Sequence, residues 1–326
     1  MVMVTKTNGA CLTVSALGCE QLSKKSRLLV GGSGLLCFAL AMPVLATDFI
    51  ITGGSVGINT VGGTNNVFVS SSGSIVTNGE YSNGIWNQGA NNTTTVSGSI
   101  TTNDLTSDGI LNQGNDNTTT VSGPIATNGN FSYGILNTGN NNTTTVSGPI
   151  TTKAQSPGIL NDGANNTTTV SGSITTEGAS SHGIMNKGDN GNTTTVSGSI
   201  VTNGRLSYGI RNYSNDNTTT VSGSITTKGE SSPGILNDGA NNTTTVSGSI
   251  TTEGASSHGI MNKGDNGNTT TVSGSIVTNG RSSQGIWNSG NDNTTTVSGS
   301  ITTKGESSYG IRNDGNNNTT TVSGSI

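Results

Sequence analysis

A unit of about 25 residues is repeated ten times in this chain, between Ile75 and Ile326. Its consensus is G-I-x-N-x-G-x-N-N-T-T-T-V-S-G-S-I-T-T, and the Ile of G-I occupies positions 85, 110, 135, 159, 184, 210, 235, 260, 286 and 311. A fixed period of this length is typical of repeat architectures, in which one unit cannot bury its apolar face alone and neighbouring units must stack. The period therefore predicts a stacked scaffold and argues against a globular enzyme.

The composition of the unit predicts strands and argues against helices. Each unit contains several Gly and a run of β-branched Thr, Val and Ile, which suit strands and weaken helices. The Leu framework of leucine-rich repeats is missing. We therefore expect an all-β fold, a right-handed parallel β-helix (β-solenoid) with three short strands per coil and about 25 residues per coil. Units stacked in register place each residue on its equivalent at the ~4.8 Å strand spacing.

Length changes and prolines indicate where the coil bends. One residue is missing between Ile150 and Ile159, and one is inserted between Ile184 and Val196, as expected for turns. Proline is disfavoured inside a central strand, where it loses a hydrogen bond, and it occurs in the S-G-S segment or before G-I at Pro124, Pro149, Pro157 and Pro233. We expect bends before G-I, at N-x-G-x-N-N and at S-G-S, with the strands I-x-N, T-T-T-V and I-T-T between them.

The inward side chains of each coil are expected to form ladders along the stack. Alternation places about three aliphatic residues inside each coil, for example Ile85, Val96 and Ile100. The Asn of G-I-x-N, as in Asn87 and Asn112, is then placed to form amide-to-amide hydrogen bonds between coils. A turn residue that faces solvent is the alternative interpretation of this Asn.

The first 46 residues have the features of a secretory signal peptide with a long N-terminal part. Lys24, Lys25 and Arg27 precede an apolar run, 28–46, that has a Pro near its end and small residues at its exit. Cleavage is expected after Ala46. A membrane anchor is the alternative, because the run is about long enough to span a bilayer.

Removal of residues 1–46 leaves a chain without cysteine, since Cys11, Cys19 and Cys37 all lie in this segment. Such a chain enters an oxidising compartment with no disulfide to form, which suits a protein that crosses a second membrane unfolded. Four basic residues and one acid also leave, so the net charge changes from −4 to −7. A basic footprint for nucleic acid is absent, and we expect no nucleic-acid partner.

Residues 47–72 are less regular than the units that follow. We expect them to form an N-terminal capping segment, because the edge of a terminal coil is otherwise open. Residues 73–326 are expected to form the solenoid. The sequence stops at Ile326 inside a unit, and we interpret it as a fragment or a product truncated within the repeat.

No constellation of residues predicts an active site. An active site is expected to break the repeat symmetry, whereas His182 and His258 occupy equivalent turn positions in copied units. Acids such as Asp116 and Asp189 lie in Asn-rich turns, where local hydrogen bonds to the backbone explain them. We therefore expect no enzyme activity, no cofactor and no metal site.

The x of G-I-x-N is the variable position with the clearest functional interest. Strand alternation places it opposite the inward Ile and Asn, and Arg in two of ten units supports exposure. We predict an outward apolar contact stripe with intermittent Arg, suited to a partner; packing against another segment and sequence drift are the alternatives. The stripe consists of Trp86, Leu111, Leu136, Leu160, Met185, Arg211, Leu236, Met261, Trp287 and Arg312.

The long signal, the cysteine-free exported region and Gly-, Asn- and Thr-rich units such as 84–96 (GIWNQGANNTTTV) resemble autotransporter passenger domains, from the type V secretion systems of Gram-negative bacteria. The resemblance covers the signal and all of 47–326. It implies export through the inner membrane and a right-handed β-helix at the cell surface, on the outer membrane or released outside, commonly as an adhesin. The implied partners are a host-cell or matrix surface, glycans or further copies of the chain. Membrane contact is expected only through the family's C-terminal β-barrel, which is missing from these residues.

The leading hypothesis is thus a non-enzymatic adhesin or structural stalk. A β-helical polysaccharide lyase or hydrolase is one alternative, but it needs an asymmetric acid/base cluster, and none is visible in the sequence. An ice-binding solenoid is another, since Thr95, Ser97, Ser99 and Thr101 recur in the units as a candidate hydroxyl face. The bend at S-G-S and the prolines at 124 and 149 argue against the flatness of that face.

Overall fold

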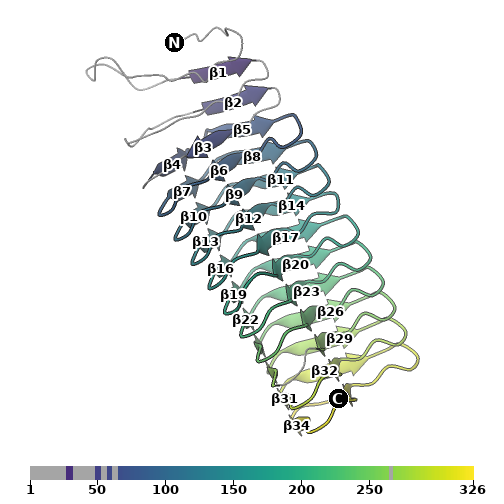
Figure 1. The fold of residues 1–326 in the computed structure, drawn as a ribbon. Helices are drawn as coiled ribbons and strands as arrows, with labels where there is room; N and C mark the ends of the chain where they lie inside the picture. The colour runs from purple at the N-terminus through teal and green to yellow at the C-terminus, as the bar shows by residue number, and fades with distance from the viewer. Residues whose placement is uncertain (1–26, 32–47, 53–56, 61–64, 264–266) are drawn as a thin grey trace.

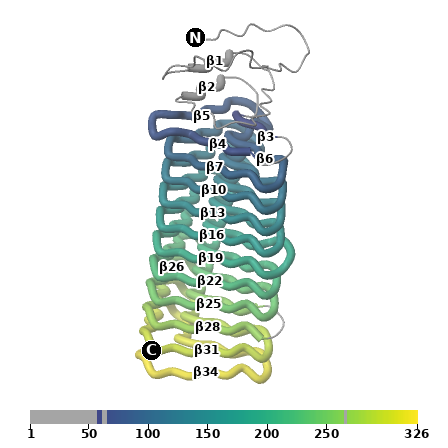
Figure 2. Tube along the Cα trace, turned by 90° about the vertical axis from the view of Figure 1, so that its left-hand side faces the viewer, coloured from purple at the N-terminus to yellow at the C-terminus, as the bar shows by residue number. Residues whose placement is uncertain are grey.

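The stacked units form an all-β parallel β-solenoid of about ten coils, with three strands in each coil and about 25 residues per turn (Figure 1). The computed structural model describes residues 27–31, 48–52, 57–60, 65–263 and 267–326, and for 27–31 and 48–52 it describes the backbone only. In these residues every named element is a strand. The coils lie above one another in a column, with β5 near one end and β34 at the other (Figure 2).

Sheet 1 contains the I-x-N strands and one I-N-T strand at its N-terminal end, each paired in parallel with its equivalent in the next coil. Its eleven strands are β3 (Ile58–Thr60), β6 (Ile85–Asn87), β9 (Ile110–Asn112), β12 (Ile135–Asn137), β15 (Ile159–Asn161), β18 (Ile184–Asn186), β21 (Ile210–Asn212), β24 (Ile235–Asn237), β27 (Ile260–Asn262), β30 (Ile286–Asn288) and β33 (Ile311–Asn313).

Sheet 2 contains the T-T-T-V strands and one N-V-F-V strand at its N-terminal end. Its eleven strands are β4 (Asn66–Val69), β7 (Thr93–Val96), β10 (Thr118–Val121), β13 (Thr143–Val146), β16 (Thr167–Val170), β19 (Thr193–Val196), β22 (Thr218–Val221), β25 (Thr243–Val246), β28 (Thr269–Val272), β31 (Thr294–Val297) and β34 (Thr319–Val322).

Sheet 3 contains the strands centred on the Ile that follows S-G-S or S-G-P. Its ten strands are β5 (Ser74–Thr77), β8 (Ser99–Thr102), β11 (Ile125–Thr127), β14 (Ile150–Thr152), β17 (Ser173–Thr176), β20 (Ser199–Thr202), β23 (Ser224–Thr227), β26 (Ser249–Thr252), β29 (Ser275–Thr278) and β32 (Ser300–Thr303). Separately, β1 (Arg27–Gly31) pairs in parallel with β2 (Asp48–Thr52).

The three expected bends are confirmed, and two of them use the left-handed backbone conformation. Thr106 before G-I and Asp116 in the Asn-rich turn have φ values of 52° and 57°, and equivalent residues in other coils repeat this. At the third bend, S-G-S, glycine is needed because coils approach closely: a Cβ on Gly198 would overlap the carbonyl oxygen of Gly172 in the preceding coil. Pro157 and Pro233 lie at the first bend, outside the strands.

Aliphatic ladders fill the interior as expected. Ile85, Val96 and Ile100 are fully buried, one from each sheet, and each lies in register on its equivalent in the next coil. Burial of such a side chain stabilises the fold by ~1.5–3 kcal/mol. The core is therefore a continuous column in which each coil covers the next.

The buried Asn of sheet 1 forms the amide ladder, and the alternative of a solvent-facing turn residue is wrong. Asn87 is fully buried, and its Nδ2 donates to Oδ1 of Asn112 at 2.6 Å and to Oγ1 of Thr94 at 3.0 Å. The same amide-to-amide bond links each successive pair of coils down to Asn288 and Asn313. Because each amide uses its donors and acceptor inside the core, the polar ladder leaves no large desolvation penalty.

Two further ladders were not anticipated from the sequence. Oδ1 of Asn117 accepts a hydrogen bond from the backbone N–H of Asn92, and this repeats at the equivalent Asn of the other coils. Oγ of Ser107 accepts from the backbone N–H of Ser82 in the same way. Both side chains satisfy backbone donors at the turns, where no sheet partner is present.

The strands of sheets 1 and 2 begin within the segment expected to cap the solenoid. β3 and β4 lie in 47–72 and pair in register with β6 and β7. Within the predicted signal peptide only β1 is described, so most of that segment lies outside the described residues. A right-handed coil and cleavage after Ala46 both stay predictions.

We predict that Val196→Asp will disrupt the solenoid, because it places an unpaired charge in the fully buried Val ladder of sheet 2. The expected loss of stability is at least about 3 kcal/mol, measured by thermal unfolding followed by circular dichroism. Val201→Asp is the matched control, because Val201 lies on the half-buried outer side of β20. Equal losses in the two variants would contradict the assignment of the core.

Candidate contact surface

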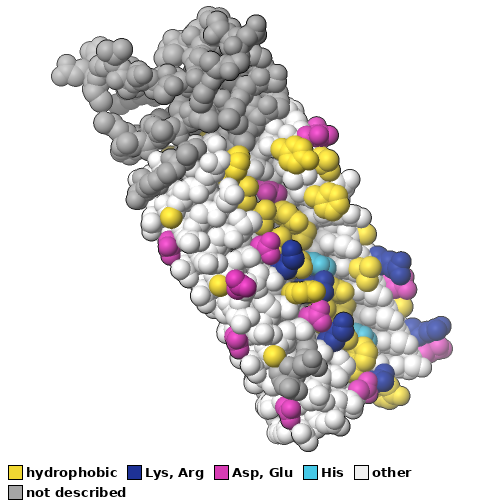
Figure 3. Space-filling model, viewed as in Figure 1, with side chains coloured by type: hydrophobic (Ala, Val, Ile, Leu, Met, Phe, Trp, Pro, Cys, Tyr) yellow, Lys and Arg dark blue, Asp and Glu magenta, His cyan; other side chains and the backbone are white. Residues whose placement is uncertain are grey.

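The outer face of sheet 1 is the part of the solenoid where chemically diverse side chains gather. Hydrophobic, basic, acidic and histidine side chains form a band that follows the stack (Figure 3). The band combines three columns, one residue from each coil: the residue before the Gly of G-I, the contact stripe of G-I-x-N, and the residue after the Asn. We call these the first, second and third columns.

The second column is the predicted stripe, and the structure places all ten of its residues on the outer side of sheet 1. Its exposure varies along the stack. Leu160 and Leu236 are only 5% and 4% exposed, so the expected exposure does not hold at these two coils. Arg312 is exposed, and the other seven are half-buried. Neighbouring columns and coils therefore cover much of the stripe.

Arg211 is the centre of the densest polar and aromatic cluster on this face. Its guanidinium lies over the rings of Tyr208 and Tyr213, 5.4 Å and 4.7 Å from their centroids, and pairs with Asp238 of the next coil at 3.0 Å. Lys263 reaches the other oxygen of Asp238 at 3.7 Å. Cation–π and ion-pair contacts hold Arg211 in place, so the cluster is a preformed surface.

A second cluster surrounds Trp287 near the C-terminal end. The guanidinium of Arg312 lies over the ring of Trp287, 5.2 Å from its centroid. Nε1 of Trp287 donates to Oδ2 of Asp314 at 2.9 Å. Arg312 also pairs with Asp314 at 2.8 Å, and the rings of His258 and Trp287 meet edge to face with their centroids 4.8 Å apart. The two clusters thus use the same combination of aromatic ring, Arg and Asp.

The histidines of the first column have a structural role. His182 is buried and stacks on Tyr208, with 4.7 Å between the rings, and its Nδ1 accepts the backbone N–H of Tyr208 at 3.1 Å. His258 accepts from the backbone N–H of Gln284 in the same way. Burial lowers the pKa of His182 to about 3, and the charge of Arg211 acts in the same direction. Burial lowers the pKa of His258 to about 4.

Asp108 occupies the same column with the opposite consequence for its pKa. Its Oδ1 accepts the backbone N–H of Tyr133 at 2.8 Å, and its own N–H donates to Asn83 at 2.7 Å. Burial raises the pKa of Asp108 to about 7, although the hydrogen bond from Tyr133 opposes this. Its carboxylate is therefore the buried group of this face that charges near neutral pH.

Variation between copied units is concentrated on this face. Residues 156–205 and 232–281 are identical, and the segments after them, 206–232 and 282–308, differ at five places. Three of the five pairs belong to the three columns, and the remaining two lie in the flanking turns: Tyr208/Gln284, Arg211/Trp287, Tyr213/Ser289, Leu206/Ser282 and Ser214/Gly290. The core, sheet 2 and sheet 3 are unchanged in these copies, so substitutions accumulated only around sheet 1.

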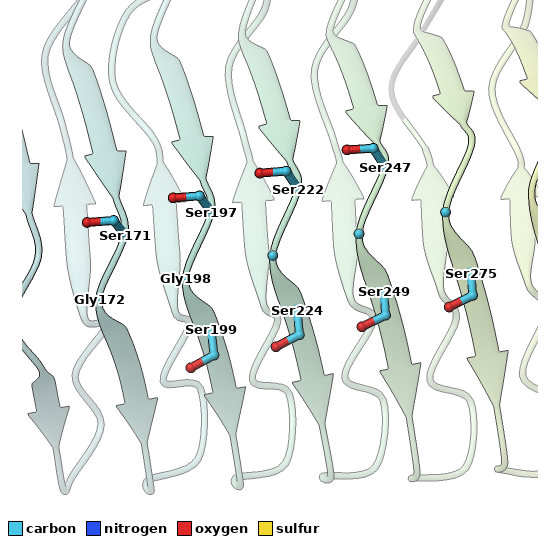
Figure 4. A pocket seen from close by; sticks show the side chains of 13 residues that line it. Ser171, Gly172, Ser197, Gly198, Ser199, Ser222, Ser224, Ser247, Ser249 and Ser275 are labelled. Carbon is cyan, nitrogen blue, oxygen red and sulfur yellow. The ribbon is translucent and has the colours of Figure 1, made fainter.

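A trough along the S-G-S bend differs in character from the sheet 1 face. Figure 4 shows Ser171, Ser197, Ser222 and Ser247 in one row and the Ser residues that open sheet 3 strands in a second row. Its lining consists of Ser and Gly alone. Close stacking of coils explains the glycines, and the trough confirms the bend that argued against a flat face across S-G-S.

The sequence singled out the second column but missed the first and third. Their residues flank the strand at the two turns, so strand alternation did not assign them to a face. In the described residues, no group of three or more His, Cys, Asp or Glu side chains could hold a metal ion. No helix long and apolar enough to cross a membrane occurs in that part of the chain. Comparisons with protein-family models, curated proteins and solved structures found no match.

We predict that Asp108 makes the fold less stable as the pH rises. Because its pKa is about 7 in the folded state and near 3.8 in the unfolded chain, its stabilising contribution is complete below about pH 4 and is lost as the pH rises through 7. Asp108→Asn keeps the acceptor for Tyr133, so at pH 8 it should be more stable than the parent by roughly 1–3 kcal/mol. Thermal midpoints from pH 5 to pH 8 measure this, and a difference independent of pH would contradict it.

The histidines should have the opposite effect. Their folded pKa values lie below the ordinary 6.5, so their contribution is complete above pH 6.5 and is lost as the pH falls toward 4. Replacing both His182 and His258 by Gln, which occurs naturally at position 284 in the same column, should reduce unfolding by acid between pH 6.5 and 4. The measurement is the thermal midpoint of parent and variant as a function of pH. If only protonation is involved, the difference between the two midpoints should vanish above pH 7.

Proposed function

We propose that the chain is a non-enzymatic, exported surface protein that acts as an adhesin or structural stalk, similar in role to an autotransporter passenger domain. The contact surface is the three-column face of sheet 1. The solenoid provides length and rigidity, and its repeated coils present the same three positions at regular intervals. The partner is a host-cell or matrix surface, a glycan, or another copy of the chain.

The single observation that carries this proposal is the difference between the faces of one solenoid. Copied units retain the core and sheets 2 and 3 without change, yet substitute Tyr208, Arg211 and Tyr213 on sheet 1. Aromatic residues and Arg are the side chains enriched at protein interfaces and binding hot spots. The fold does not depend on the identity of these surface residues, so they can change while the scaffold stays the same. Such variation on a constant scaffold is typical of surfaces that recognise a specific partner.

The enzyme alternative has less support. Three described acids of the sheet 1 face pair with bases: Asp162 with Lys187, Asp238 with Arg211 and Asp314 with Arg312. The fourth, Asp108, is buried and accepts the backbone N–H of Tyr133. Glycoside hydrolysis uses two carboxyl groups that face each other across the bond to be cut. Acids that are held in ion pairs instead suit a fixed recognition surface.

We predict that Trp86→Ser, Leu111→Ser and Leu136→Ser together will lower adhesion or self-association. These side chains are half-buried on the outer side of sheet 1, so the β spectrum should persist with a thermal midpoint only slightly lower. Binding to cells, extracellular matrix and glycan arrays, and analytical ultracentrifugation, provide the measurements. The matched control is Val76→Ser, Val201→Ser and Val277→Ser on the outer side of sheet 3.

A variant that unfolds would leave the face untested, so a conservative exchange is added. Arg211→Trp introduces the residue found at the equivalent position 287, which the same scaffold accommodates. Adhesion that changes with Arg211→Trp and with the sheet 1 triple variant, but not with the sheet 3 control, supports the proposal. Equal adhesion in parent, sheet 1 variants and control would assign binding elsewhere.

A further inference from the structure

The outer side of sheet 2 carries two continuous rows of threonine that run along the stack over ten coils. We call each row a rank. In each T-T-T-V strand the first and third Thr point outward, while the second Thr and the Val point inward. Strand pairing is in register throughout, so Thr93 lies on Thr118 and Thr95 on Thr120, and this continues to Thr319 and Thr321. The array ends at β4, where Asn66 and Phe68 occupy the two outward positions.

The fold does not require threonine at these positions. On sheet 3 the corresponding outward residue in the centre of the strand varies between Thr, Val and Ala, as at Thr101, Ala126 and Val201. On sheet 2 both outward residues are Thr in every one of the ten T-T-T-V strands. The inward Thr is explained by its bond to the Asn ladder, as between Thr94 and Asn87. Within the described part of the chain, the outward hydroxyls of sheet 2 bond to no other protein group.

The array has a regular two-dimensional spacing. Equivalent Thr residues on neighbouring strands lie ~4.8 Å apart, and the two outward Thr of one strand lie ~6.7 Å apart. Side-chain ladders keep parallel sheets flatter than the usual twisted sheet, and the coils here stack as a column (Figure 2). β-branched Thr is restricted at χ1, so its methyl and hydroxyl groups are held with little remaining freedom.

The composition and size of the face argue against a protein partner. Its ten coils carry no charged or aromatic side chain at the outward positions, whereas protein interfaces depend on such anchors. Ten strands of four residues cover roughly 45 Å by 13 Å, or about 600 Å². A standard interface buries about 800 Å² on each partner, so this face alone falls short for a stable dimer.

We infer that the outer face of sheet 2 binds the surface of ice. Faces of hexagonal ice present oxygen atoms in a rectangular grid whose repeats are close to the two threonine spacings. The hydroxyls replace water positions in that grid, while the methyl groups lie in the hollows between them. A neutral partner fits the uncharged face, and a periodic partner fits ten identical coils. The face shares Thr95 with the hydroxyl surface considered from the sequence, but it lies wholly on the T-T-T-V strands, which end before the S-G-S bend.

The test measures ice growth in the presence of the folded chain. The parent should shape ice crystals and lower the temperature at which they grow below their melting temperature. Thr195→Lys with Thr245→Lys, which places two bulky charges in one rank of sheet 2, should abolish this effect. Thr175→Lys with Thr226→Lys is the matched control, because it makes the same change in alternate strands of sheet 3, and it should retain the effect.

The outcomes separate this inference from its alternatives. A folded parent without effect on ice growth overturns it, and so does an equal loss of activity in both Lys variants. Binding to crystalline cellulose or chitin through sheet 2, without an effect on ice, assigns the face to a polysaccharide lattice instead. The sheet 1 variants should keep full ice activity, so this inference and the proposed adhesion face can fail independently.

Discussion

The in-register stacking of equivalent side chains is the constraint on which this structure depends. A single coil buries only about three aliphatic residues and cannot cover its own strand edges, so every coil needs a neighbour. Stacking brings each Asn of sheet 1 onto the next. The side-chain amide hydrogen bond from Asn87 to Asn112 repeats along the whole column. A buried amide is costly without partners, so this ladder also penalises any shift in register.

The same stacking makes each face of the solenoid a repeated pattern. What one coil presents, the next presents ~4.8 Å away, and a single exposed position becomes a column. The faces have diverged in chemistry. Sheet 2 shows uniform threonine, the S-G-S bend shows serine and glycine, and sheet 1 carries a mixture of aromatic, aliphatic, charged and histidine side chains. A uniform face suits a periodic partner, whereas the diverse face suits a partner recognised at particular coils.

Buried titratable groups on sheet 1 link this diversity to stability. Asp108, His182 and His258 each accept a backbone N–H from the following coil, so the three side chains perform one structural task. Burial raises the pKa of the acid and lowers the pKa of the bases, because it disfavours the charged form of each. The choice of acceptor at this column therefore sets the direction in which pH changes the stability of that part of the stack.

The sequence by itself determined the parallel solenoid, its three bends, the strands between them, the inward Ile and Val and the Asn ladder. These follow from local rules, because identical units stacked in register all adopt the conformation of a single coil. Only the tertiary structure decided which flanking residues join the stripe, because Tyr208, Tyr213 and Asp238 reach Arg211 across turns and coils. It also decided that Leu160 and Leu236 are covered, and that sheet 2 forms a separate threonine face. These properties depend on the packing of side chains around bends, which strand alternation does not specify.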